Sequence, residues 1–158
     1  MLILTGMDNS GKTTLANQLS QQLGRPIAKS LGPQATPSEK DLWLLDQMTR
    51  EKSFPNSVIF DRFLPFEEMI YGKILRGGSQ YSLDDYYLSQ LWDLAPTIIY
   101  TRPPSGVIFN FGEREQMSGV IEKKGELLQA WDDLMWAMMS RGWDVRVYDY
   151  TAKMEVNL

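Results

Sequence analysis

Residues 6–13 constrain the fold of this chain more than any other segment. They read Gly-Met-Asp-Asn-Ser-Gly-Lys-Thr and match the pattern G-x-x-x-x-G-K-[ST] in full. Glycine lets the backbone curl so that successive N–H groups point inward and form a concavity that binds anions. Lysine at the seventh position reaches the β- and γ-phosphates of a nucleotide, and the hydroxyl at the eighth ligates Mg²⁺. The segment therefore predicts a loop that holds a nucleoside triphosphate with magnesium.

The sequence on both sides of this loop supports the interpretation. The apolar run 2–5 precedes it directly, as a buried parallel strand would. Residues 12–23 predict a helix, because leucines recur at every fourth position from Leu15 and Gly24 supplies a stop signal. Strand, loop and helix follow in the order that phosphate binding requires, which disfavours the alternative of a glycine-rich turn without a ligand. The residues expected to contact the bound nucleotide are Gly6, Asn9, Ser10, Gly11, Lys12, Thr13 and Thr14.

Strand and helix patterns alternate along the rest of the chain. Further strands are predicted at residues 25–31, 58–61, 97–100 and 145–148, and helices at 38–52, 82–94 and from about 127 to 142. This alternation predicts an α/β fold with a mostly parallel five-stranded sheet between two helical layers. No linker divides the chain, so residues 1–158 are expected to form a single domain. We expect Ser82 to cap the second of these helices. The first is indicated by the spacing of Leu42, Leu45, Met48 and Thr49, which we expect on its buried face.

Composition excludes several classes of function. The chain has no cysteine and no histidine, so disulfides, thiolate metal sites and histidine-based acid–base catalysis are excluded. The net charge of −4 disfavours nucleic acid as a partner, although a local basic groove would still allow it. No apolar run is long enough to cross a membrane, and we expect a cytoplasmic protein without a membrane partner. Whether the chain is a monomer or a homodimer is left open.

The segment of about residues 103–125 differs from the rest of the chain. It is polar, contains glycine at positions 106, 112 and 119, and carries Arg114 among several other charges. Long segments without clear periodicity are uncommon inside compact domains and often serve as lids or binding loops. We therefore predict a lid here, with an ordinary solvated helix as the alternative.

Residues suited to phosphoryl transfer lie outside the loop as well. Asp61 follows an apolar strand, at the edge where parallel sheets bind ligands, and predicts a contact with a magnesium-bound water or with the acceptor. Arg62 suits a forked contact with an acceptor phosphate. Arg114 is the first candidate for a cation that neutralises the transferring group, and Arg102 is the second. The alternatives are a helix-capping Asp61, an Arg62 held in a structural ion pair, and surface positions for the other two arginines.

Two of these motifs together resemble a known family. The loop with Asp8 inside it, followed by the run Val58-Ile59-Phe60-Asp61-Arg62-Phe63, is similar to the thymidylate kinase branch of the nucleoside monophosphate kinases. The resemblance implies a three-layer P-loop kinase fold, ATP and Mg²⁺ as cofactors, and a small nucleotide as substrate. It further implies that Asp8 meets the acceptor sugar and that Arg62 meets the acceptor phosphate. From the motifs themselves, we expect Lys12, Asp61, Arg62 and Arg114 to act in catalysis. Thr13 and Asp61 are the implied metal-site residues.

Other positions extend or weaken this resemblance. Residues 147–149 with Thr151 look like the family's last strand and its adenine-contacting loop. Asn9 stands where one subtype has a catalytic arginine, so the chain resembles the subtype whose arginine comes from the lid, which favours Arg114. After residue 63 the sequence departs from the family and looks more like small bacteriophage-type kinases related to it.

The acceptor region is the part that the resemblance defines least. Glu67 and Tyr71 share a helix face if Pro65 starts a helix, and both are candidates for the acceptor sugar. For Tyr71, packing against the sheet is the favoured alternative. Trp43 and Arg50 are candidates for base recognition, but a role in the core is favoured for Trp43.

Three functions follow from these patterns. The leading hypothesis is ATP- and Mg²⁺-dependent phosphoryl transfer to a deoxynucleoside monophosphate. A second is a kinase that acts on a hydroxyl of a nucleoside, a modified DNA base or a polynucleotide end, with Asp61 or Asp8 as general base. The third is a nucleotide-dependent switch or binding module, for which the GTP-specific Asn-Lys-x-Asp element is missing.

Overall fold

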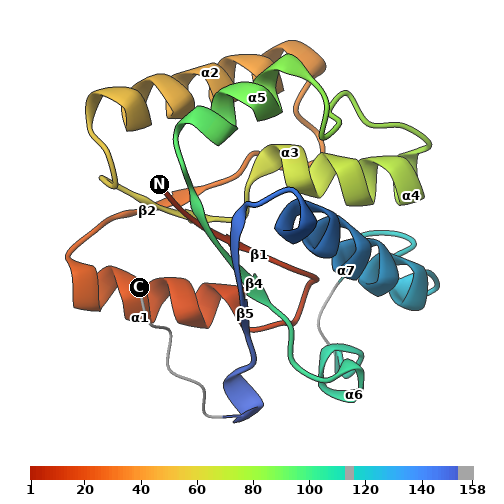
Figure 1. Cartoon of the computed structure of the whole chain (residues 1–158). Helices are drawn as coiled ribbons and strands as arrows, with labels where there is room; N and C mark the ends of the chain where they lie inside the picture. Colours follow the sequence, from red (N-terminus) through yellow and green to blue (C-terminus); the bar gives the residue numbers. More distant parts are fainter. Residues whose placement is uncertain (113–115, 153–158) are drawn as a thin grey trace.

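The sheet is the centre of the molecule. The computed structural model describes residues 1–112 and 116–152. Five parallel strands form one sheet in the order β2-β3-β1-β4-β5, which confirms the predicted α/β class (Figure 1). The strands are β1 (Leu2–Thr5), β2 (Ile27–Lys29), β3 (Ile59–Asp61), β4 (Thr97–Thr101) and β5 (Asp144–Tyr148).

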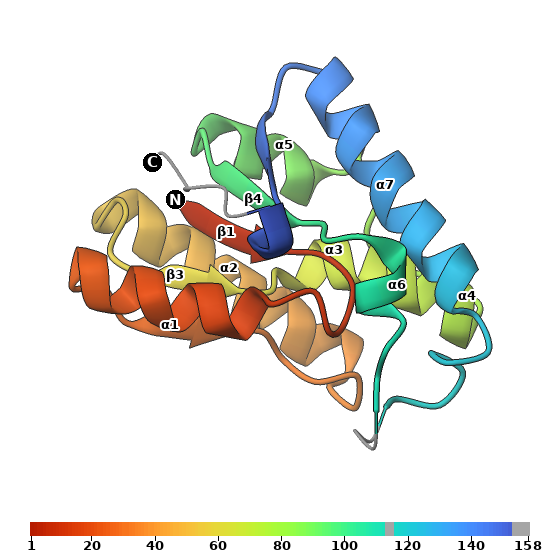
Figure 2. The same cartoon turned by 90° about the horizontal axis from the view of Figure 1, so that it is seen from below.

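Helices cover both faces of this sheet and produce three layers. One face is covered by α1 (Lys12–Leu23), and the helices that pack on the other are α2 (Pro37–Ser53), α3 (Leu64–Glu67), α5 (Tyr86–Asp93) and α7 (Lys124–Ser140) (Figures 1 and 2). A π-helical turn, η1 (Glu68–Gly72), continues α3 into α4 (Lys73–Arg76). Two short elements follow β4 and β5, namely α6 (Ser105–Ile108) and the 3₁₀ turn η2 (Tyr150–Ala152).

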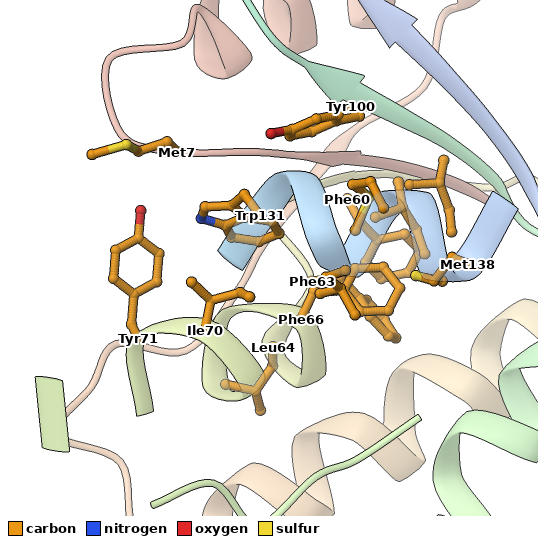
Figure 3. Close-up of a cluster of buried hydrophobic side chains, with 14 of the residues drawn as sticks. Met7, Phe60, Phe63, Leu64, Phe66, Ile70, Tyr71, Tyr100, Trp131 and Met138 are labelled. Atoms are coloured by element: carbon orange, nitrogen blue, oxygen red, sulfur yellow. The ribbon is translucent and has the colours of Figure 1, made fainter. Parts of the chain in front are cut away.

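Alternation along the strands divides the core in two. Leu2 and Leu4 face α1, whereas Ile3 between them faces the larger cluster under the other helices. That larger cluster contains a run of aromatic rings, with Phe60 and Phe63 at its centre (Figure 3). Trp43 packs against both rings, with centroids 6.5 and 6.2 Å away, so it is a core residue, as the sequence favoured.

The predicted buried face of α2 is confirmed at Met48, which is buried, but wrong at Leu42, Leu45 and Thr49. Leu42 and Leu45 are 67% and 57% exposed, whereas Leu44 is 1% exposed. The buried stripe instead contains polar residues, including Lys40, whose ammonium group pairs with the carboxylate of Glu68 at 3.1 Å. Hydrophobic periodicity misplaced the face because tertiary ion pairs allow charged side chains to occupy inward positions.

The predicted cap of α5 is also wrong. The helix starts at Tyr86, and Asp85 caps it by accepting a hydrogen bond from the backbone N–H of Leu88 at 2.9 Å. The same carboxylate accepts one from the N–H of Ser82 at 2.7 Å, so Ser82 belongs to the preceding turn. The bounds predicted for β1 and α1 are confirmed. Within the part of the chain that the structure describes, no helix combines the length and apolarity that a bilayer requires.

Replacing Leu44 and Leu45 separately by alanine tests the orientation of α2. We expect Leu44→Ala to lower the free energy of unfolding by about 2–5 kcal/mol, because it leaves a cavity in the core. Leu45→Ala should change it by less than about 0.5 kcal/mol, because that side chain is already largely in water. Urea denaturation of both variants measures the difference. Equal losses would contradict the observed orientation.

Candidate functional site

The phosphate-binding loop joins β1 to α1 at the carboxyl edge of the sheet, and its shape requires glycine at two positions. Gly6 has a φ of +132°, and a Cβ there would lie 2.6 Å from the carbonyl oxygen of Thr101. Gly11 has a φ of +90° at the start of α1, and a Cβ there would lie 2.9 Å from the ring of Tyr150. Both positions combine a left-handed backbone with close neighbours, which only glycine accommodates.

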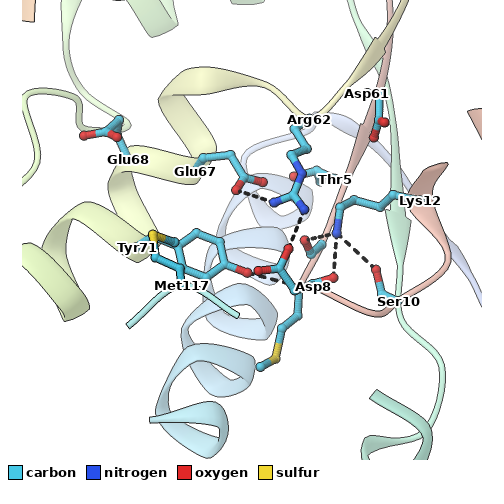
Figure 4. A network of polar contacts seen from close by, with 12 residues as sticks. Thr5, Asp8, Ser10, Lys12, Asp61, Arg62, Glu67, Glu68, Tyr71 and Met117 are labelled. Carbon is cyan, nitrogen blue, oxygen red and sulfur yellow. Dashed lines mark hydrogen bonds and ion pairs between the residues drawn. The ribbon is translucent and has the colours of Figure 1, made fainter. Parts of the chain in front are cut away.

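Lys12 folds back into the loop that carries it. Its ammonium group donates to the carbonyl oxygens of Gly6 at 2.7 Å and Met7 at 2.5 Å, and lies 3.4 Å from the hydroxyl of Ser10 (Figure 4). Burial lowers the pKa of Lys12 to about 8, and the positive charge of Arg62 adds to the effect. The loop thus holds a cation at its centre, surrounded by carbonyl dipoles.

Thr13 and Asp61 form the part of the site that suits a metal ion. The hydroxyl of Thr13 donates to Oδ2 of Asp61 at 3.2 Å. The other carboxylate oxygen, Oδ1, is buried and has no hydrogen-bond partner among the described residues. Mg²⁺ prefers oxygen ligands and commonly takes one or two from the protein, with water and phosphate oxygens completing the shell. An unpartnered carboxylate oxygen beside the hydroxyl of Thr13 fits that requirement, although the described residues form no cluster of three or more acidic side chains.

The guanidinium of Arg62 lies between two carboxylates. One nitrogen pairs with Asp8 of the loop, and the other with Glu67 at 3.1 Å (Figure 4). Burial alone would lower the pKa of Arg62, but the negative charges of Glu67 and Asp8 outweigh it and raise the pKa. The backbone of Arg62 is left-handed, with a φ of +74°, and its N–H donates to the carbonyl oxygen of Leu4 at 3.0 Å. The turn after β3 therefore aims this side chain at the loop.

Glu67 and Tyr71 come from α3 and the π-helical turn that follows it. Oε1 of Glu67 is buried and lacks a hydrogen-bond partner within the described ranges, and burial raises the pKa of this carboxyl despite the nearby cations. The hydroxyl of Tyr71 accepts a hydrogen bond from the backbone N–H of Asp8 at 3.2 Å. Its ring also packs against Trp131, with centroids 6.2 Å apart. Tyr71 therefore packs in the core and reaches the loop as well. Bulges of this π type often occur at functional sites.

Two cavities meet beside Arg62, and we name them the donor cavity and the acceptor cavity after the substrates that we propose they bind. The donor cavity, of about 340 Å³, lies over the phosphate-binding loop and is bounded by Gln116. The acceptor cavity, of about 240 Å³, is lined by residues 30–33 and by the helix that carries Glu67. Arg62 and Met117 line both cavities, so they mark the boundary between them.

The wall of the acceptor cavity contains charged residues that the sequence did not reveal. Glu68 and Arg76 both line it, with their side chains paired at 2.5 Å. The other oxygen of Glu68 binds Lys40 of α2. These three residues lie on three different elements, so no local pattern identifies them. Trp43 and Arg50, the two candidates for base recognition, are not among the described residues that line this cavity.

A third cavity, of about 410 Å³, lies on the other side of the loop. Tyr148 and Tyr150 line it together with Gly11 and the first turns of α1. Thr151, the residue expected near adenine, is exposed, and its hydroxyl donates to Asp149 at 2.7 Å. Tyr150 was not predicted here, although an aromatic residue two positions after the end of β5 is a visible signal.

The predicted lid segment is partly built into the core. Ile108, Phe111 and Val120 are buried in the larger hydrophobic cluster, whereas Gln116 and Met117 of the same segment face the donor cavity. Arg114 lies outside the described residues.

Arg102, the second candidate cation, is held in an ion pair. Its guanidinium donates to both carboxylate oxygens of Asp132 on α7, at 2.7 and 2.9 Å. Two parallel hydrogen bonds of this kind fix a guanidinium in place. Arg102 therefore joins the end of β4 to α7, and the described lining of the donor cavity does not include it.

The side chain of Asn9 contacts the segment after β4. Its amide nitrogen donates to the backbone carbonyl oxygens of Val107, Ile108 and Asn110, at 3.1, 3.1 and 2.9 Å. Asn9 also lines the donor cavity and the third cavity.

Comparisons with known proteins identify the fold. No family model and no curated protein matches the sequence. Among solved structures, the YorR protein from Bacillus subtilis in complex with phosphorylated GDP has a TM-score of 0.73 at 20% identity, over 95% of this chain and 85% of that one. A deoxyadenosine kinase from M. mycoides with bound dATP has a TM-score of 0.63 at 19% identity, over 98% and 92%. A gluconokinase from Sinorhizobium meliloti 1021 has 0.50 at 13%, over 94% and 81%. Together with the sheet order and the phosphate-binding loop, these likenesses show that the chain has the P-loop kinase fold.

Proposed function

We propose that this protein is an ATP- and Mg²⁺-dependent kinase that transfers the γ-phosphoryl group to a deoxynucleoside monophosphate, in the manner of thymidylate kinases. One observation carries the proposal. The donor cavity and the acceptor cavity meet at Arg62, beside the buried ammonium group of Lys12. Phosphoryl transfer depends mainly on positioning two substrates and neutralising charge between them, and this junction provides for both.

The donor half of the reaction follows from the loop. Its backbone N–H groups and Lys12 would bind the β- and γ-phosphates, so the phosphate oxygens replace the carbonyl oxygens that now surround the ammonium group. Thr13 and Asp61 would hold Mg²⁺, which when bound would neutralise negative charge on the phosphates. Gln116 and Met117 line the donor cavity, where they would limit the access of water to the transferring group.

The acceptor half follows from Arg62 and its neighbours. Its guanidinium would bind the acceptor phosphate in a forked contact, held in place by Asp8 and Glu67. Asp8 and Tyr71 would contact the acceptor sugar. A nucleotide phosphate is already ionised at neutral pH, so the attacking oxygen needs no general base. This agrees with a chain that has no histidine.

A specific observation favours a second candidate, in which the acceptor is a nucleoside hydroxyl. Both sides of the Arg62 guanidinium are occupied by carboxylates, and Oε1 of Glu67 is unpartnered within the described residues. The γ-phosphoryl group would then bond to the hydroxyl oxygen, the bond to ADP would break, and the hydroxyl proton would pass to a carboxylate. Burial raises the pKa of Glu67, which makes its carboxylate a better base than an exposed one.

Acceptor panels distinguish the two candidates. Purified protein would be incubated with labelled ATP, Mg²⁺ and either the four common deoxynucleoside monophosphates or the corresponding deoxynucleosides. We expect label to appear in a deoxynucleoside diphosphate. Label found only in monophosphate products would select the hydroxyl acceptor instead. Transfer to neither panel would reject the proposal that the chain is a nucleotide or nucleoside kinase.

Replacing Arg62 by alanine should weaken use of the acceptor selectively. Loss of a forked, charge-assisted contact is expected to raise KM for the acceptor by about tenfold or more, while the Kd for ATP changes by less than about threefold. Arg50→Ala is the matched control, since Arg50 is exposed on α2. Steady-state kinetics and ATP titrations measure both quantities. An unchanged acceptor KM in Arg62→Ala would contradict the assigned role.

ATP affinity should depend on the protonation of Lys12. Its pKa is lowered to about 8 without ligand, so the ammonium group loses its charge as the pH rises through that value. Phosphate oxygens favour the charged form, and the Kd for ATP should therefore increase above pH 8, by up to about tenfold per pH unit. Titrations from about pH 7 to about pH 10 test this. Lys12→Met should bind ATP more weakly and without this pH dependence; a flat wild-type profile would refute the prediction.

A further inference from the structure

The side chain of Asn9 joins the phosphate-binding loop to the segment that leaves the end of β4. A single amide nitrogen lies 2.9–3.1 Å from three backbone carbonyl oxygens, those of Val107, Ile108 and Asn110. These carbonyls belong to the end of α6 and the turn behind it. The last carbonyls of a helix have no partner within the helix. The carbonyl oxygen of Val107 also accepts from the backbone N–H of Asn110 at 3.3 Å, and the amide of Asn9 supplies a further donor to this helix end.

The backbone at Asn9 permits this contact. Its φ is +64°, in the left-handed region that asparagine tolerates better than most residues with a side chain. The loop N–H groups can therefore bind phosphate while the side chain of Asn9 is used elsewhere. Asn9 lines both the donor cavity and the third cavity.

The residues that Asn9 contacts precede, along the chain, two residues that border the donor cavity. After α6 the side chain of Phe111 enters the core, and Gln116 and Met117 of the same segment line the donor cavity. At its far end the segment is attached elsewhere, where Val120 is buried in the core and the ammonium group of Lys123 donates to the carbonyl oxygen of Ile74 at 2.8 Å. The contacts of Asn9 are thus made where the segment begins, directly against the loop.

We propose that Asn9 is a positioning residue that couples the conformation of the phosphate-binding loop to that of residues 107–112. Phosphate binding orders the loop, and the contacts of the Asn9 amide transmit that order to the end of α6 and to the residues up to Gly112. The kinetic part of this inference rests on the proposed kinase function, because small displacements of a cavity wall reduce transfer to an acceptor. The structural part requires only that the loop binds a nucleotide.

Asn9→Gly is the variant that isolates the side-chain amide. Glycine keeps the left-handed backbone without strain, whereas alanine at this φ adds a backbone cost of its own. Asn110→Ala is the matched control, because it alters the exposed partner residue but leaves its backbone carbonyl in place. Asn9→Gln, which retains an amide on a longer side chain, is expected to restore part of any lost function. Thermal unfolding of each variant checks that the fold is intact.

Hydrogen exchange on the full chain tests the coupling independently of turnover. A non-hydrolysable ATP analogue with Mg²⁺ should slow amide exchange in both the loop and residues 107–112 of the wild type and of Asn110→Ala. In Asn9→Gly, protection of the loop should persist and that of residues 107–112 should be lost. If the analogue does not change exchange in residues 107–112 of the wild type, or if Asn9→Gly keeps that protection, the inference is wrong.

Kinetics provide the second measurement once an acceptor has been found. Asn9→Gly should lower kcat for transfer by about tenfold or more and raise the ratio of ATP hydrolysis to transfer, with the Kd for ATP changed by less than about threefold. If Asn9→Gly binds ATP more weakly and melts at a lower temperature but keeps the wild-type ratio of ATP hydrolysis to transfer, the role of Asn9 is purely structural and the inference is wrong. If no acceptor reacts, the proposed function fails, yet the exchange experiment still decides the coupling.

Discussion

The parallel pairing of β1 with β3 is the constraint on which the site depends. Leu4 lies opposite Asp61 in the register, and the N–H of Arg62 continues the ladder by donating to the carbonyl oxygen of Leu4. β1 is followed directly by the phosphate-binding loop, so this register places Asp61 beside Thr13 and Arg62 beside Asp8. A slip of one residue would turn both charged side chains to the other face of the sheet.

The sequence was most informative where structure is decided locally. The first strand, the loop and α1 were predicted with correct bounds, because one contiguous segment carries the apolar run, the glycines and the helix pattern. Asp61 and Arg62 were expected beside the phosphate-binding loop because the carboxyl ends of parallel strands lie at the same edge of the sheet. The structure brings these two parts together through Asp8 and Arg62.

Features that arise from long-range contacts were not predictable in this way. Lys40 is buried on α2 only because Glu68, on a distant element, neutralises it, and hydrophobic periodicity alone therefore selected the wrong face. Arg102 was a reasonable candidate cation until the structure placed it against Asp132. The loop pattern accepts any residue at position 9, so it carries no signal for the contacts of Asn9. Those contacts depend on α6, which folds beside the loop.

The π-helical turn after α3 separates two neighbouring carboxylates. Glu67 contacts Arg62, at the boundary of the two cavities, whereas Glu68 contacts Lys40 and Arg76 in the wall of one of them. Side chains adjacent in sequence thus belong to two electrostatic groups that share no ion-pair partner among the described residues. Substitutions in the wall group can reshape the acceptor cavity while the Arg62 group is retained. In the kinase that we propose, selectivity for the acceptor would therefore be able to diverge independently of the residues that handle phosphate.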